Sequence, residues 1–313
     1  MTIWLVAAGV ALIPVILGGR IARPLASADW ARRNPRAALV LWQAIGLAGG
    51  LGAIGIGLVA AAAPLEAVFP HGMHTLVTRF VGGHGLDGLG PVHIAALIWS
   101  ITVLAWLLAH TVRAAVVSVN SRRRQRLLVD VVADHLPDHD IYILPSSQRV
   151  AYCVPGGTGR VVLSQGTVDL LDQEEFEAVL KHERAHVHGR HDLVLLPFVA
   201  LDHAFGRLPL VRTARQAVAV LIEMIADDHA RHAHGELPLA RALVRMAEPA
   251  AASGSGSFAL AEAGVAERLQ RLLAPEPRTR WAPAAAYSAA SLLLSGPLAI
   301  LTAPILCLTV WNI

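Results

Sequence analysis

The sequence predicts a mainly α integral membrane protein with four transmembrane helices and a cytoplasmic α+β domain between the third and the fourth. Charged residues make up only 16% of the 313 residues and hydrophobic residues 55%, whereas soluble domains carry about 25% charged residues. Four uncharged apolar runs are each long enough to cross a bilayer, and they lie at 3–19, 37–63, 92–112 and 284–310. The chain is therefore expected to comprise a three-helix membrane region at 1–119, a domain at 120–283 and a last membrane helix at 284–313.

Arginines predict the orientation of these spans. Five arginines lie in the loop 20–36, and another cluster occupies 113–126, after the third run. Because basic residues are retained on the cytoplasmic side of a membrane, the loop 20–36 and the domain are expected in the cytoplasm and the loop 64–91 outside. The chain is thus predicted to be a multi-pass protein of the cell membrane with both termini outside. No basic residue precedes the first run, so we expect a retained span and not a cleaved signal peptide.

Short strands and two longer helices are expected in the domain. Runs rich in β-branched and aromatic residues predict three strands, at 141–144, 150–154 and 161–163. Asp172 and Glu175 have the spacing of a capping box, from which a helix is expected to continue to Gly189. A second helix is expected over 211–234, with Gly235 as its C-terminal cap. The segment 193–201 is an apolar stretch expected in the core or at the membrane interface. The segment 248–257 is expected to be a flexible loop and 267–273 a short helix.

The first of these helices carries the sequence His182-Glu183-Arg184-Ala185-His186, an H-E-x-x-H pair. Two histidines four residues apart project from the same face of a helix, so both imidazoles can bind one ion. Zinc held by two imidazoles, one further ligand and an open position forms a hydrolytic site. Glu183 lies where it can take a proton from the attacking water. The same pattern also arises by chance on a solvated helix, and only the rest of the domain can distinguish the two interpretations.

Two acidic candidates can complete such a site. Glu223 and Asp227 lie four residues apart on the second helix, in apolar surroundings where a carboxylate needs a metal or a histidine as partner. Asp192 is the alternative, because residues 182–192 also read H-E-x-x-H-x-x-G-x-x-D. We favour Glu223, since the acidic pair accounts for more of the chain. The remaining nearby histidines, His188 and His191, are expected on the surface of the same helix end.

The H-E-x-x-H helix follows three expected spans and precedes a fourth, and Glu223-x-x-x-Asp227 lies on the next expected helix. This arrangement resembles the membrane metallopeptidases of the beta-lactam signal-transducer type (BlaR/MecR). The resemblance implies a zincin-like (gluzincin) domain that holds one Zn²⁺ per chain. By the same resemblance, His182, His186 and Glu223 are the metal ligands and Glu183 is the general base. Asp227 then orients a ligand imidazole from behind.

The resemblance also implies a membrane-embedded endopeptidase that cleaves a cytoplasmic protein, such as a winged-helix transcriptional repressor or the chain itself. No serine-acylated sensor domain follows the last span and no S-x-x-K occurs, so covalent sensing of a beta-lactam is not expected. The expected partners are the lipid bilayer and a protein or peptide substrate; nucleic acid is not expected, and homo-oligomer formation stays open.

A non-enzymatic membrane sensor of metal or pH, or a transporter, is the alternative function. It would use the histidines in and beside the outer loop, which are His71, His74, His84 and His93. A transporter usually shows polar or ionisable residues inside its spans or internal repeats. Here only His110 and scattered Gln and Ser qualify, and no repeat is visible. We therefore favour the peptidase.

Overall fold

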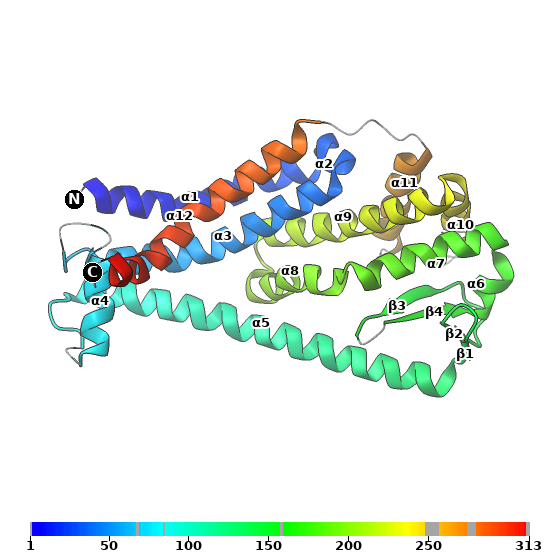
Figure 1. The fold of residues 1–313 in the computed structure, drawn as a ribbon, viewed down its shortest axis with the longest axis horizontal. Helices are drawn as coiled ribbons and strands as arrows, with labels where there is room; N and C mark the ends of the chain where they lie inside the picture. Colours follow the sequence, from blue (N-terminus) through cyan, green and yellow to red (C-terminus); the bar gives the residue numbers. More distant parts are fainter. Residues whose placement is uncertain are drawn as a thin grey trace.

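The computed structural model describes residues 2–66, 69, 71–83, 85–156, 159–247, 257–273 and 280–310. Most of these residues are helical, and one small sheet lies at the end of the molecule remote from the start of α1 (Figure 1). The first helices are α1 (Thr2–Ala26), α2 (Asp29–Arg33), α3 (Pro35–Ala62), α4 (His71–Val81) and α5 (Pro91–Val132). The strands are β1 (Asp134–Leu136), β2 (Ile141–Leu144), β3 (Ala151–Val154) and β4 (Arg160–Ser164). The later helices are α6 (Gln165–Leu170), α7 (Gln173–His188), α8 (His191–Phe205), α9 (Pro209–His234), α10 (Leu237–Ala247), α11 (Ser257–Leu273) and α12 (Ala282–Val310).

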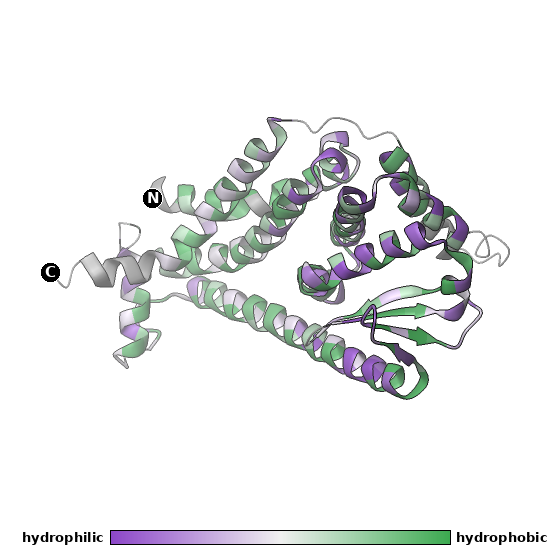
Figure 2. Ribbon diagram, turned by 45° about the vertical axis from the view of Figure 1, so that its right-hand side comes forward, coloured by the Kyte–Doolittle hydropathy of each residue, from purple (hydrophilic) through white to green (hydrophobic). Residues whose placement is uncertain are grey.

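Four helices of the described chain are long and apolar enough to cross a membrane, which agrees with the four apolar runs of the sequence. They cover Leu5–Ala26, Pro35–Ala62, Pro91–Val132 and Ala282–Thr302. Helix α3 is central, since α1, α5 and α12 all pack against it. Its small residues allow this close approach: a Cβ at Gly57 would overlap the Ser100 hydroxyl of α5, which donates a 2.8 Å hydrogen bond to the Ile54 carbonyl. Apolar colouring dominates these helices in Figure 2.

Helix α5 continues without a break from the apolar region into the polar one. It comprises 42 residues, Pro91–Val132, and its far end reaches strands β2 and β3 (Figure 1). The predicted boundary between 119 and 120 therefore falls inside one helix. The prediction placed the boundary where charged residues follow the apolar run. Arginine has about the same helix propensity as leucine, so a change from apolar to basic residues does not end a helix.

The sheet has the strand order β1-β2-β4-β3. Strands β2 and β4 are parallel, whereas β1 with β2 and β3 with β4 are antiparallel. The three strands predicted from the sequence are present. Strand β1 was missed, because its three exposed residues Asp134, His135 and Leu136 have no apolar alternation. Strand β3 forms one edge of the sheet and lies beside α7.

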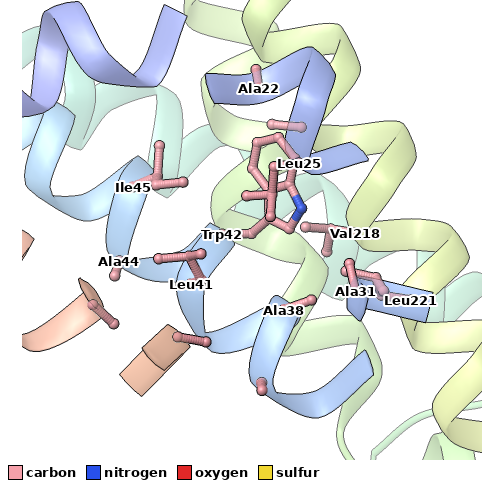
Figure 3. Packing of buried hydrophobic residues seen from close by; sticks show 14 of the residues in the cluster. Ala22, Leu25, Ala31, Ala38, Leu41, Trp42, Ala44, Ile45, Val218 and Leu221 are labelled. Atoms are coloured by element: carbon pink, nitrogen blue, oxygen red, sulfur yellow. The ribbon is translucent and has the colours of Figure 1, made fainter. Parts of the chain in front are cut away.

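The membrane helices and the domain share one apolar core. Trp42 of α3 is 1% exposed, and Figure 3 shows its ring between Leu25 of α1 and Val218 of α9. Phe198 of α8 belongs to the same cluster, and the Gln43 side chain donates a 2.7 Å hydrogen bond to the Val194 carbonyl of α8. Phe198 and Ala200 of the apolar stretch 193–201 are thus buried in the core, whereas Leu193 is exposed.

Several short elements escaped the sequence analysis. Helices α4, α6 and α10 occupy segments for which no helix was predicted. The predicted loop 248–257 lies outside the described residues except for Ser257, which begins α11. The predicted helix 267–273 is the second half of α11.

Candidate metal centre

Helix α7 is fixed at its start by the predicted capping box. The Asp172 carboxylate accepts a 2.9 Å hydrogen bond from the Glu175 amide, and Glu175 accepts one of 3.1 Å from the Asp172 amide. Arg245 of α10 donates a further 3.0 Å hydrogen bond to the same Glu175 oxygen. The buried residues 178–180 then pack against the sheet and α10. This anchoring fixes which face of α7 turns towards α9.

Helices α7 and α9 pack against each other and bring three potential ligands together. His182 Nε2 lies 3.2 Å from His186 Nε2 and 3.4 Å from Glu223 Oε2. His186 Nε2 lies 3.5 Å from Glu223 Oε1. Zinc bonds of about 2.0–2.2 Å that meet at tetrahedral angles place neighbouring ligand atoms about 3.3–3.6 Å apart. The spacing of these three donor atoms therefore fits one zinc ion, and they form the one such group of three or more His, Cys, Asp or Glu side chains in the described residues.

Each histidine presents Nε2 to this point, while its Nδ1 lies close to a polar atom of another side chain. Asp227 Oδ1 lies 3.0 Å from His182 Nδ1, and its side chain is only 1% exposed. His191 Nδ1 lies 2.8 Å from His186 Nδ1. A partner at Nδ1 selects the tautomer that leaves Nε2 for a metal. The Asp227 carboxylate thus lies at Nδ1 of His182, and the His191 imidazole lies at Nδ1 of His186.

His191 corrects one prediction. It was expected on the surface at the end of the H-E-x-x-H helix, together with His188. The structure begins a new helix, α8, at His191 after Arg190, which has a left-handed backbone (φ 46°). This turn directs His191 back towards His186 and leaves it 7% exposed, whereas His188 is exposed as predicted.

Arg268 of α11 is a second residue that the sequence analysis missed. Its guanidinium donates hydrogen bonds of 2.8 and 2.6 Å to the two Asp227 oxygens and lies 3.2 Å from Glu223. A signal was present, because Val265, Leu269 and Leu272 define one apolar face of the helix and Arg268 lies on that face. An arginine on an apolar face requires a buried acidic partner, and Asp227 is that partner.

The two candidate ligand histidines, His182 and His186, differ in the direction in which their pKa values are shifted. Burial disfavours the charged form of His182, but contacts with the Asp227 and Glu223 carboxylates outweigh it and raise the pKa of His182 to about 9. Burial dominates at His186 and lowers its pKa to about 4. It does the same at His191, whose pKa is also about 4. His191 is therefore neutral and can accept a hydrogen bond from His186.

The carboxylates of the site differ as well. Burial raises the pKa of Glu223, yet the hydrogen bond with His182 and the charge of Arg268 reverse this effect and lower it to about 2. Glu223 is thus anionic at any physiological pH, as a metal ligand needs to be. Burial raises the pKa of Glu183, which makes its carboxylate a stronger base than an exposed one.

Strand β3 packs beside α7 and is an edge strand of the sheet in the described residues. Burial, followed by the charges of Glu183 and Asp192, raises the pKa of the Cys153 thiol to about 12, so the thiol is neutral. Tyr152 and Val154 belong to a cluster with Val129 of α5.

The other predicted candidates are placed elsewhere. Asp192, the alternative third ligand, forms a 2.6 Å ion pair with Arg122 and connects α8 to α5. The outer histidines His71, His74 and His93 join no group of three potential ligands within the described part of the chain. His84 lies outside the described residues.

Comparisons with known proteins agree with this site. The sequence model of peptidase family M48 matches residues 118–301, more than half of the chain. The Protease HtpX homolog of Aquifex aeolicus (strain VF5) is 36% identical over 76 residues, which are 24% of this chain and 25% of that protein. The matched part thus spans about a quarter of this relative. No solved structure matches the chain.

The third ligand can be tested by metal content. We expect about one zinc per chain in the parent protein and its loss from Glu223→Ala, as from His182→Ala or His186→Ala, because two ligands do not hold the ion. Asp192→Ala should keep the zinc. Elemental analysis of the purified variants measures both, and zinc retained by Glu223→Ala but lost by Asp192→Ala would establish the alternative ligand set.

His191→Ala should weaken zinc affinity by about 10–100-fold, since it removes the group that orients His186. His188→Ala is the matched control, an exposed histidine three residues away that should leave affinity unchanged. His191→Gln, which keeps a hydrogen-bond acceptor, should recover part of the loss. Competition with a zinc chelator measures the affinity, and equal affinities for the parent and His191→Ala would contradict the orienting role.

Proposed function

Because the chain belongs to peptidase family M48, we propose that it is a multi-pass membrane zinc endopeptidase that hydrolyses peptide bonds of a protein substrate at the cytoplasmic face. The observation that carries this proposal is the convergence of His182, His186 and Glu223 at tetrahedral ligand spacing, with Glu183 on the same helix as the two histidines. The anionic Glu223 and the two oriented imidazoles suit a single Zn²⁺ per chain.

Glu183 supplies the proton transfers of the reaction. Bound zinc would contribute Lewis acidity, polarising the scissile carbonyl and lowering the pKa of water. Glu183, with its pKa raised by burial, takes the proton as the water oxygen attacks the carbonyl carbon. The C–N bond then breaks, and Glu183 returns that proton to the leaving amine. Its position next to His182 in sequence places the base beside the ligands.

An extended peptide can bind along strand β3. Edge strands offer unpaired amide and carbonyl groups to a further strand, and in the described sheet β3 pairs only with β4. Strand β3 packs beside α7, the helix that carries Glu183, which supports a peptide site there. A substrate segment added to β3 would therefore lie across the metal centre in an extended form.

The sidedness of the protein is part of the proposal. The arginines at 20–36 and 113–126 support a cytoplasmic location for the metal centre. The sensor or transporter function has less support, since His71, His74 and His93 form no three-ligand group in the described residues. The predicted resemblance to beta-lactam signal transducers, with repressor cleavage or self-cleavage, stays a prediction; the family match supports the peptidase chemistry alone.

Glu183→Gln separates catalysis from metal binding. The amide keeps the shape of the side chain but removes the base, so zinc content should stay at the parent level while peptide hydrolysis falls by about 10²–10⁴-fold. Glu174→Gln, an exposed residue on the same helix, should leave hydrolysis unchanged. Cleavage of an unfolded protein substrate by the purified protein, followed by gel electrophoresis, measures the rate. Undiminished cleavage by Glu183→Gln would refute the proposed mechanism.

Reporter fusions test the sidedness. A reporter that is active only in the cytoplasm should work when fused after residue 130 and fail when fused after residue 75, because the intervening span carries the chain back across the membrane. A reporter active only outside should give the opposite result. Cytoplasmic activity after residue 75 would reverse the proposed orientation.

A further inference from the structure

A second polar site lies on α7 and α9, on helices that also hold the metal ligands. It is a pocket of about 460 Å³ lined by Arg36, Lys181, Asp228, His229, His232 and Ala233. These residues come from three elements: the start of α3, the middle of α7 and the end of α9. Lys181 precedes the ligand His182 and is the only lysine of the chain. Apart from Asp228 and Ala233, every lining side chain is basic or can become so.

The pocket has an excess of positive charge. Its one acid, Asp228, already accepts hydrogen bonds of 2.8 and 2.9 Å from Arg271 and lies 3.4 Å from Arg231. Arg36 and Lys181 are exposed, and neither has a carboxylate partner among the side chains that the structure describes. Two cations therefore face a pocket whose acid is neutralised from the other side.

His229 holds the Arg36 guanidinium at this pocket. His229 Nδ1 lies 2.8 Å from the Ile225 carbonyl, to which it donates. Its Nε2 then accepts a hydrogen bond from Arg36, at 3.2 Å from Nη2. This contact uses one edge of the guanidinium. The remaining N–H groups, in their planar arrangement, are free to bind two oxygens of one anion.

Arg36 also lies in the first turn of a helix that is long and apolar enough to span a membrane. It is the second residue of α3, and no charged residue follows it in that helix. The 28 residues of α3 span about 42 Å at 1.5 Å per residue, whereas the hydrocarbon core of a bilayer is about 30 Å thick and the bilayer with headgroups about 40–45 Å. The first turn of α3 therefore reaches the layer of lipid phosphates on the side where arginines gather.

We propose that Arg36 and Lys181 bind the phosphate of an anionic phospholipid from the cytoplasmic leaflet. Basic pockets between membrane helices on this side bind such headgroups. The inference rests on the membrane placement in the proposed function but does not depend on peptidase activity. One phosphate in this pocket would connect α3, which spans the membrane, with α7 and α9, which carry His182 and Glu223.

The test is a titration of the full-length protein in detergent with phosphatidylglycerol, followed by native mass spectrometry. Phosphatidylglycerol should bind tightly at one site per chain and phosphatidylcholine should not. Arg36→Gln and Lys181→Gln should each weaken binding about fivefold, and the double variant about 25-fold. Arg36→Lys should recover only part of the loss, because its ammonium keeps the charge but lacks the planar pair of N–H donors. Arg241→Gln is the matched control, an exposed arginine on α10, and should bind as the parent does.

Zinc content checks that each variant is folded, and Glu183→Gln should bind the lipid like the parent even if no peptidase activity is found in any form of the protein. Unchanged affinity in the double variant, or an equal loss in Arg241→Gln, would overturn the proposal. Inorganic phosphate that binds the parent as tightly as the lipid, with the same sensitivity to Arg36→Gln, would assign the pocket to a soluble anion instead. A poly-glutamate peptide that binds there while phosphatidylglycerol does not would assign it to an acidic protein segment.

Discussion

The arrangement of the metal centre depends on one buried carboxylate, that of Asp227. It is almost fully buried and contacts His182 on one side and Arg268 on the other, so it connects α7, α9 and α11. An ionised group in such surroundings is stable only with charged or hydrogen-bonding partners. If His182, Asp227 or Arg268 were replaced by an apolar residue, a buried charged group would lose a partner. The next residue repeats the arrangement, because Asp228 binds Arg271, whose Nε also donates to the Arg32 carbonyl of α2.

These ion pairs operate within a core that the membrane helices help to build. Trp42 packs against Val218 of α9, only five residues before the ligand Glu223, and Gln43 is hydrogen-bonded to α8. The catalytic helices are therefore not a separate unit attached by linkers. The expected division at 119/120 falls inside α5, which continues across it, whereas the division at 283/284 lies within two residues of the start of α12.

The parts of this structure that depend on local sequence could be predicted, and the parts that depend on distant contacts could not. The spacing of His182 and His186, the capping box at Asp172 and the stop at Gly235 are all local signals, and the structure contains each of them. The proximity of Glu223 to the two histidines was expected from the resemblance to a known metallopeptidase family, since the residues alone left Asp192 as an alternative third ligand. Arg268 lies 86 residues from His182, and only the packing of α11 on α9 brings it there. His191 was misplaced because the left-handed turn at Arg190, a residue type that rarely adopts it, starts a new helix.

Helix α5 gives the molecule a stiff mechanical element. Its 42 residues form a rod about 63 Å long that begins beside α4 and ends under the sheet (Figure 1). No proline interrupts it after Pro91, so it has no hinge of the usual kind. A rigid rod of this length that pivots by 5° at its first residue displaces the other end by about 5 Å. Changes in bilayer thickness alter helix tilt. Because α5 packs against β2 and β3, a change in its tilt would displace the strands that lie beside the candidate metal centre.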